Sequence, residues 1–151
     1  MTVAVIIAAQ VVAASLRVGV GDGSEAIVRV VEDRSAGYLL KVDCITRCAR
    51  PMHYAVPVGD APMGLVDIDR DGLIYSAWAT GCCYMVRVWK VTPAGVAKLF
   101  ETGSRGVPSL ITTPSLSVIT YMRPTNAAGQ ETSRSPQAVR WTYHHGRFER
   151  S

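Results

Sequence analysis

Three aspartates at alternate positions are the residues in this sequence best suited to metal chemistry. Asp67, Asp69 and Asp71 precede Gly72 between two apolar segments. Calcium binds about six to eight oxygen ligands, so alternate carboxylates in a tight turn suit it. An EF-hand would also carry glutamate at the twelfth loop position, where Trp78 stands instead. The sequence therefore predicts either a calcium site at these three aspartates or a solvated β-turn, since turns favour aspartate and glycine in any case.

Four cysteines offer a second kind of chemistry. Cys44 and Cys48 are close enough to bridge across a loop, and an exported protein would oxidise them. Cys82 and Cys83 are adjacent, so in a strand their side chains would point to opposite faces and could not chelate one ion. We therefore predict a Cys44–Cys48 disulfide, with Cys82 and Cys83 free or separately paired. Zinc binding by the four is the alternative, although none of the standard ligand spacings occurs.

Tryptophans offer a stacking platform for a sugar ring. Trp89 lies two residues after Arg87, so a strand would place both on one face, and Trp141 follows Arg140. An arginine on that face indicates partial exposure, which makes Trp89 and Trp141 the candidate ligand-binding residues. The alternative is that both belong to the core and to cross-strand packing, and this is the favoured interpretation for aromatic residues in strands.

Two adjacent histidines, His144 and His145, lie in a predicted hairpin turn. A catalytic role would require a nucleophile and a carboxylate beside one of them. The Gly-x-Ser-x-Gly pattern that exposes a serine nucleophile is absent from the sequence. We therefore assign no catalytic residue. A carbohydrate-active enzyme with a site on the loops near 67–72 and 144–146 is the alternative function.

The composition indicates one domain with a core of its own. The chain has 151 residues, of which 48% are hydrophobic and 19% are charged, and its formal net charge is +4. The arginines are scattered singly along the sequence. A nucleic-acid binder would more often cluster them on one face, so no nucleic-acid partner is expected.

Short apolar segments separated by glycine and proline turns run through the chain and position these side chains. Residues 64–100 have the pattern of a four-stranded antiparallel meander. Further strands are predicted at 16–20, 26–31, 38–43, 52–58, 109–113, 116–122, 137–143 and 147–149. The polar segment 124–136 is predicted to be a solvated loop, and its length suggests mobility or a binding role. No segment has helical periodicity. The predicted fold is all-β, with antiparallel meanders packed as a sandwich or as partial propeller-like blades and little or no helix.

Two parts of the chain look alike. Residues 65–99 and 110–148 share the same order of apolar strands, a tryptophan-containing strand and a final glycine turn. In this alignment the segment 73–78 matches 116–121, so Trp78 corresponds to Tyr121. The offset of about 45 residues between the two parts suits a four-stranded propeller blade. Residues 16–60 would be a diverged third unit. Since propellers typically need at least about four blades to close, the chain either forms a homo-oligomer or packs its meanders as a twisted sandwich.

Two short motifs carry a resemblance to a known family. The turn from Asp67 to Gly72 resembles the Asp-x-Asp-x-Asp-Gly turn of FG-GAP or VCBS-type propeller blades. The segment Trp-Thr-Tyr-His-His-Gly-Arg-Phe, which begins at Trp141, is similar to the final hairpin of such blades. The resemblance covers about half of the chain. It implies calcium in the acidic loop and a place on the surface of an extracytoplasmic binding module.

Residues 1–14 are apolar and end in small residues, as a signal peptide does. No lysine or arginine precedes Arg17, so the positively charged region of a signal peptide is missing. The segment is therefore either a signal peptide cleaved after Ala14 or the first strand, and residues 15–151 form a single β domain. With export, the protein would be periplasmic or secreted, and it would meet a membrane only during export.

These features together predict a non-catalytic extracytoplasmic β-rich module that binds or scaffolds. Its partner would be a protein or a glycan, and calcium is the candidate cofactor. The prediction depends on the strand-rich meanders, the low charge and the paired cysteines.

Overall fold

A computed structural model of the chain describes residues 12–21, 23–47, 53–57, 60–69 and 71–151. These residues form twelve strands and no helix. The strands are β1 (Val12–Gly19), β2 (Glu25–Asp33), β3 (Gly37–Thr46), β4 (His53–Pro57), β5 (Ala61–Asp67), β6 (Leu73–Ala79), β7 (Tyr84–Thr92), β8 (Gly95–Ser104), β9 (Ser109–Ile111), β10 (Ser117–Met122), β11 (Gln137–His144) and β12 (Arg147–Arg150). The described residues contain no helix with the length and hydropathy needed to cross a membrane.

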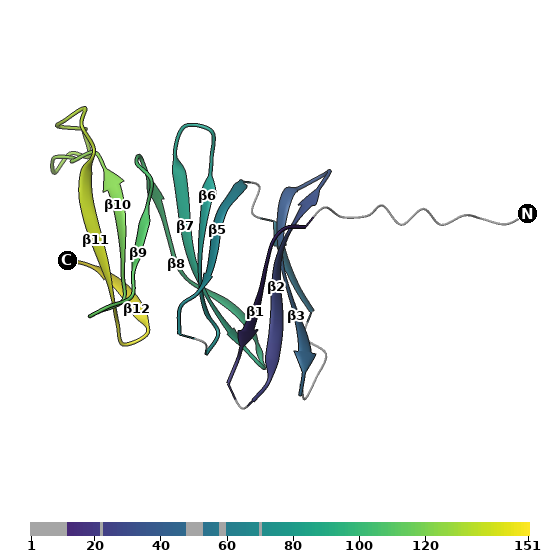
Figure 1. Cartoon of the computed structure of the whole chain (residues 1–151). Coiled ribbons are helices and arrows are strands. Elements are labelled where there is room, and N and C mark those ends of the chain that lie inside the picture. Colours follow the sequence, from purple (N-terminus) through teal and green to yellow (C-terminus); the bar gives the residue numbers. More distant parts are fainter. Residues whose placement is uncertain (1–11, 22, 48–52, 58–59, 70) are drawn as a thin grey trace, which may run out of the picture.

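The strands form three four-stranded antiparallel sheets, each a simple meander of four consecutive strands. The first sheet is β1–β4, the second is β5–β8 and the third is β9–β12. The sheets lie side by side in chain order, with the second sheet between the other two (Figure 1). The prediction of an all-β fold built from antiparallel meanders is confirmed, and the third unit suggested for residues 16–60 is the first sheet.

Two hydrophobic cores join the three sheets. The first core packs the valines and leucines of the first sheet against Ile74, Trp78 and Trp89 of the second. The second core packs Leu73, Tyr75 and neighbouring apolar residues of the second sheet against the third. Because successive side chains of a strand point to opposite faces, β6 supplies both cores, and this explains why its sequence is a nearly continuous apolar run.

Each of the second and third sheets holds a tryptophan on its third strand by the same hydrogen bond. Trp89 lies opposite Ile74, and its indole N–H donates to the Ser76 hydroxyl at 2.9 Å. Trp141 lies opposite Val118, and its indole N–H donates to the Thr120 hydroxyl at 2.9 Å. The hydroxyl lies two residues beyond the tryptophan's partner in both sheets.

This hydrogen bond defines which residues of the two sheets are structurally equivalent. Ser76 corresponds to Thr120, and two residues further along each strand Trp78 corresponds to Met122. The sequence comparison aligned Trp78 with Tyr121, one residue earlier. That alignment is wrong by one position, and a shift of one residue in a strand moves a side chain to the opposite face.

The position at which β1 begins affects the prediction that residues 1–14 are either a cleaved signal peptide or the first strand. Val12 and Ala14 already pair with Val31 and Val30 of β2. Residues 1–11 lie outside the described residues. A cleavage after Ala14 would remove the first three residues of β1, so the signal-peptide and first-strand predictions compete for the same segment.

Candidate functional site

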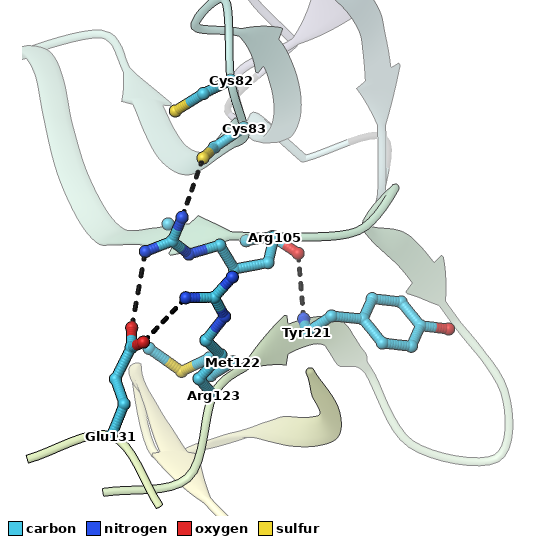
Figure 2. Close-up of a pocket in the computed structure, with 9 residues that line it drawn as sticks. Cys82, Cys83, Arg105, Tyr121, Met122, Arg123 and Glu131 are labelled. Atoms are coloured by element: carbon cyan, nitrogen blue, oxygen red, sulfur yellow. Dashed lines mark hydrogen bonds and ion pairs between the residues drawn. The ribbon is translucent and has the colours of Figure 1, made fainter. Parts of the chain in front are cut away.

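A pocket of about 360 Å³ opens between the second and third sheets. It lies where the β6–β7 turn, the end of β8 and the end of β10 come together (Figure 2). The residues that line it are Cys82, Cys83, Gly103, Ser104, Arg105, Tyr121, Met122, Arg123 and Glu131. Volumes of roughly 300 to 1,000 Å³ are usual for small-molecule sites.

The side chains at equivalent positions explain why the pocket lies here and not between the first two sheets. In the second sheet, the position equivalent to Met122 holds Trp78, which is 1% exposed and fills the space against the first sheet. The Arg87 guanidinium lies over its ring at 5.7 Å from the centroid and forms ion pairs with Asp60 and Glu101. At the third sheet the equivalent of Trp78 is Met122, a narrower side chain that leaves space beside it.

Hydrogen bonds fix the two strand ends that form the pocket wall. The Ser104 hydroxyl donates to the Gly106 carbonyl at 2.6 Å and accepts from the Tyr121 backbone N–H at 2.9 Å. The Arg105 N–H donates to the Tyr121 carbonyl at 2.7 Å. Ser104 is 4% exposed, so these bonds are shielded from water. The wall is therefore held in place before any ligand arrives.

Two guanidinium groups in the pocket share one carboxylate. Arg123 donates to Glu131 at 2.7 Å, and the second carboxylate oxygen of Glu131 lies 3.6 Å from the Arg105 guanidinium. Both guanidinium groups point toward Glu131, whereas the Tyr121 ring points away from them (Figure 2). The Nε of Arg123 is buried without a hydrogen-bond partner. The site thus carries more positive than negative charge and one unused donor.

Glu131 belongs to the polar loop between β10 and β11. Thr125 and Glu131 form an isolated antiparallel bridge. Within that bridge the Asn126 side chain accepts from the N–H groups of Ala128 and Gln130, each at 3.0 Å. The loop was predicted from composition alone, as a solvated segment. In the structure it is a small folded unit that delivers a carboxylate to the two arginines.

Cys82 and Cys83 lie at the edge of the pocket, in the turn between β6 and β7. They are the free cysteines among the described residues. The hydrogen bond between the Cys83 thiol and Cys82 is the largest of the influences that raise the pKa of Cys83, and Arg105 opposes it. The expectation that the two side chains point to opposite faces is wrong, because the pair lies in a turn, where strand alternation does not apply.

The predicted calcium turn connects β5 and β6 at the opposite end of the second sheet (Figure 1). The Asp69 carboxylate accepts the backbone N–H groups of Asp71 and Leu73, each at 2.9 Å. The Lys90 ammonium lies 3.7 Å from Asp69 and 3.8 Å from Asp71, and it donates to the Asp71 carbonyl at 2.6 Å. A cation from β7 thus already lies against this turn.

The turn is also held tightly against β7. Gly72 has φ of +87°, and a Cβ atom there would lie 2.2 Å from the Val91 carbonyl oxygen. The Val91 N–H donates to the Gly72 carbonyl at 2.8 Å. Among the described residues no three His, Cys, Asp or Glu side chains are grouped to hold a metal ion. Calcium binding by Asp67, Asp69 and Asp71 stays a prediction.

The two tryptophans that were candidates for ligand binding have different surroundings. Trp89 is 3% exposed and belongs to the first core, so its ring offers no open face to a sugar. Trp141 is half-buried, and its ring packs against Phe100 at a centroid distance of 5.4 Å. The favoured interpretation, that the tryptophan belongs to the core, is correct for Trp89. Neither tryptophan lines the pocket.

The remaining predicted residues lie away from the pocket. Cys44 lies on β3 and is disulfide-bonded, and Cys48 lies outside the described residues, so the pairing of Cys44 with Cys48 stays a prediction. His144 and His145 are exposed at the β11–β12 turn, and His145 has φ of +47°. They are not among the residues that line the pocket.

No known family model, curated protein or solved structure matches this chain. The arginines and the glutamate of the pocket were missed at the sequence level because they come from three separate segments. The only signal was the length and polarity of the loop at 124–136, which suggested a binding role without indicating which residue binds.

Proposed function

We propose that the chain is a non-catalytic β-rich binding module that recognises an acidic group of its ligand in the pocket between β8 and β10. The observation that carries the proposal is the pair of guanidinium groups, Arg105 and Arg123, that converge on the single carboxylate of Glu131. Guanidinium groups form strong charge-assisted hydrogen bonds with carboxylates, sulfates and phosphates.

The charge arrangement favours an anionic ligand over a neutral one. Glu131 neutralises one of the two arginines, so the site retains a positive charge. The Glu131 carboxylate is itself about half exposed, at 45%, and lies on a loop, so a ligand acid group can replace it without unfolding a strand.

The walls of the pocket favour binding without catalysis. No histidine occurs among the described residues that line it, and its one serine hydroxyl, that of Ser104, is already engaged in two structural hydrogen bonds. Met122 adds an apolar surface beside the arginines. An acidic head with an apolar or sugar body matches this combination, so an acidic glycan or an acidic segment of a protein is the ligand class that we propose.

Export to the periplasm or the medium is part of the proposal. Its support is the apolar segment 1–14, the low share of charged residues and the resemblance of the Asp67–Gly72 turn to blades of extracytoplasmic modules. Mass spectrometry of the protein purified from its native cells tests this part. A chain that begins near residue 15 supports export, and a chain that retains residues 1–14 contradicts cleavage.

The ligand proposal is tested on an immobilised panel of neutral, uronate-containing and sulfated oligosaccharides. The native chain should bind uronate-containing or sulfated members and leave the neutral ones. Arg105→Gln and Arg123→Gln should each weaken binding about tenfold or more, because each removes a charge-assisted contact.

Arg140→Gln is the matched control for this experiment. Arg140 lies on β11 of the same sheet, is exposed and does not line the pocket, so its loss changes the net charge equally. Binding that falls equally in all three variants would show an effect of overall charge and contradict the proposed site. Binding to neutral members alone would contradict it as well.

A further inference from the structure

The adjacent cysteines at the edge of the pocket have no part in the proposed recognition of an acidic group. Cys82 is exposed and Cys83 is half-buried, and both are free thiols. Two free thiols side by side at the mouth of a preformed pocket form a second reactive group on the same surface, and it does not depend on what the arginines bind.

The turn brings the two sulfur atoms to the same side. The Thr80 N–H donates to the Cys83 carbonyl at 2.9 Å, and Gly81 takes φ of +87°, which closes a tight turn between β6 and β7. Both cysteine side chains leave this turn in the same direction (Figure 2). The two sulfurs are therefore placed to bond to a single atom.

A cation lies beside this pair. An Nη atom of Arg105 lies 3.9 Å from the Cys83 sulfur and is a donor to it. The hydrogen bond with Cys82 raises the pKa of the Cys83 thiol, and the Arg105 guanidinium opposes that rise without cancelling it. Both cysteines line the pocket of about 360 Å³, so a bulky group attached to the captured atom has space to enter.

We infer that Cys82 and Cys83 form a dithiol site that captures a trivalent arsenical. In the reaction of an organic arsenoxide with the pair, two arsenic–sulfur bonds form and the arsenic–oxygen bond breaks. The oxygen leaves as water with the two thiol protons, and neither sulfur nor arsenic changes its oxidation state. No oxidant or reductant takes part.

The geometry selects this ligand over the metal ions that cysteines usually hold. Structural zinc takes four ligands, and no third His, Cys, Asp or Glu joins the pair among the described residues. A two-coordinate monovalent copper ion prefers its two sulfurs on opposite sides. Trivalent arsenic is pyramidal and bonds neighbouring sulfurs at a bent angle, which suits two thiols that leave one turn in the same direction.

Phenylarsine oxide is the probe. The full chain is kept reduced with a phosphine, treated with the probe and examined by intact-mass spectrometry under native conditions. We expect one phenylarsenic group per chain, with the loss of two hydrogens, and peptide mapping should place it on the segment that contains Cys82 and Cys83. Cys82→Ser and Cys83→Ser should each reduce the affinity at least about a hundredfold, since the second bond is no longer intramolecular.

The double variant Cys44→Ser, Cys48→Ser is the matched control, because it removes the two other cysteines, which the phosphine would otherwise release as thiols, and leaves the adjacent pair intact. This variant should retain the adduct. An adduct that survives undiminished in Cys82→Ser, or that maps to the segment of Cys44 and Cys48, overturns the inference. Thermal unfolding of each variant confirms that it is folded, and neither result depends on whether the chain binds an acidic glycan.

Discussion

The two interfaces between the sheets share a hydrogen bond from a tryptophan to a hydroxyl group, but the pocket lies at only one of them. Between the first and second sheets, Trp78 and Trp89 both donate their indole N–H to the Ser76 hydroxyl at 2.9 Å, and Arg87 covers Trp78. Between the second and third sheets, Trp141 alone donates to Thr120, and Met122 occupies the place of Trp78. The first interface is closed, and the second opens into the pocket.

The difference shows how a repeated unit can acquire a site without a change of fold. The hydrogen bond between tryptophan and hydroxyl fixes the same register in both sheets. What varies is the bulk of one side chain at the end of the second strand and the charge beside it. In the closed interface the arginine is paired with Asp60 and Glu101 at the wall, whereas in the open one Arg105 and Arg123 line an accessible space.

The largest expected effect comes from removing the shared hydroxyl of the closed interface. Ser76→Ala leaves two buried indole N–H groups without an acceptor, and we expect the free energy of unfolding to fall by about 2–4 kcal/mol. Thr120→Val removes the acceptor of one half-buried indole, and we expect a loss of about 1 kcal/mol. Chemical denaturation of both variants measures the two values, and equal losses would contradict the comparison.

The second effect tests the role of Met122. Met122→Trp restores the side chain of the closed interface, so it should fill the pocket and weaken binding of the acidic oligosaccharides about tenfold or more. The free energy of unfolding should stay within about 1.5 kcal/mol of the native value. Val107→Trp adds the same side chain at an exposed position, where Val107 is 59% exposed, and should leave binding unchanged. Undiminished binding by Met122→Trp would place the ligand elsewhere.

A smaller effect concerns the acidic turn of the second sheet, which has no acidic counterpart in the third. Lys90 lies against Asp69 and Asp71 and competes with any cation there. Lys90→Gln removes that charge, and we expect calcium affinity to rise about tenfold by isothermal titration calorimetry. Asp69→Asn added to Lys90→Gln should reverse the gain. Equal affinity in the native chain and in Lys90→Gln would show that the lysine does not compete.

The smallest expected effect is the pH dependence of the closed interface. The hydrogen bond from Lys98 and the contact with Arg87 hold the pKa of Glu101 below its usual value. A lowered pKa in the folded state contributes stability that is present above the unfolded-state value and is lost as the pH falls through the folded value. Thermal unfolding between pH 6 and pH 3 should therefore show a shallower decline in Glu101→Gln than in the native chain. An identical decline in both would exclude this contribution.

The all-β fold could be predicted from the sequence because the patterns that mark its strands and turns are local. Alternating apolar residues and glycine or aspartate turns mark each strand, and the repeat between 65–99 and 110–148 reflects two sheets with the same order of strands. The fate of Trp89 was harder to predict. Arg87 beside it suggested water, yet that arginine is covered by its own ion pairs and by Trp78.

The pocket could not be predicted from the sequence, because its residues come together only in the folded chain. The pocket depends on which face of the third sheet carries the Met122 side chain. The alignment of the two repeats was wrong by one residue at this position, which assigned the side chain to the opposite face. The pocket also depends on Arg105 and Glu131, which lie 26 positions apart in the sequence and meet only when β8 and β10 pack together. Cys82 and Cys83 were misjudged because the exact end of β6 decides whether they alternate or share one side.

Glu131→Gln gives the most direct test of the acid-binding pocket. The side chain keeps its shape and loses the negative charge that pairs with Arg105 and Arg123, so the site loses its internal competitor. Equilibrium binding of the uronate-containing or sulfated oligosaccharide selected by the native chain should become about three- to tenfold tighter in this variant. Binding that is equal or weaker in Glu131→Gln would contradict the account.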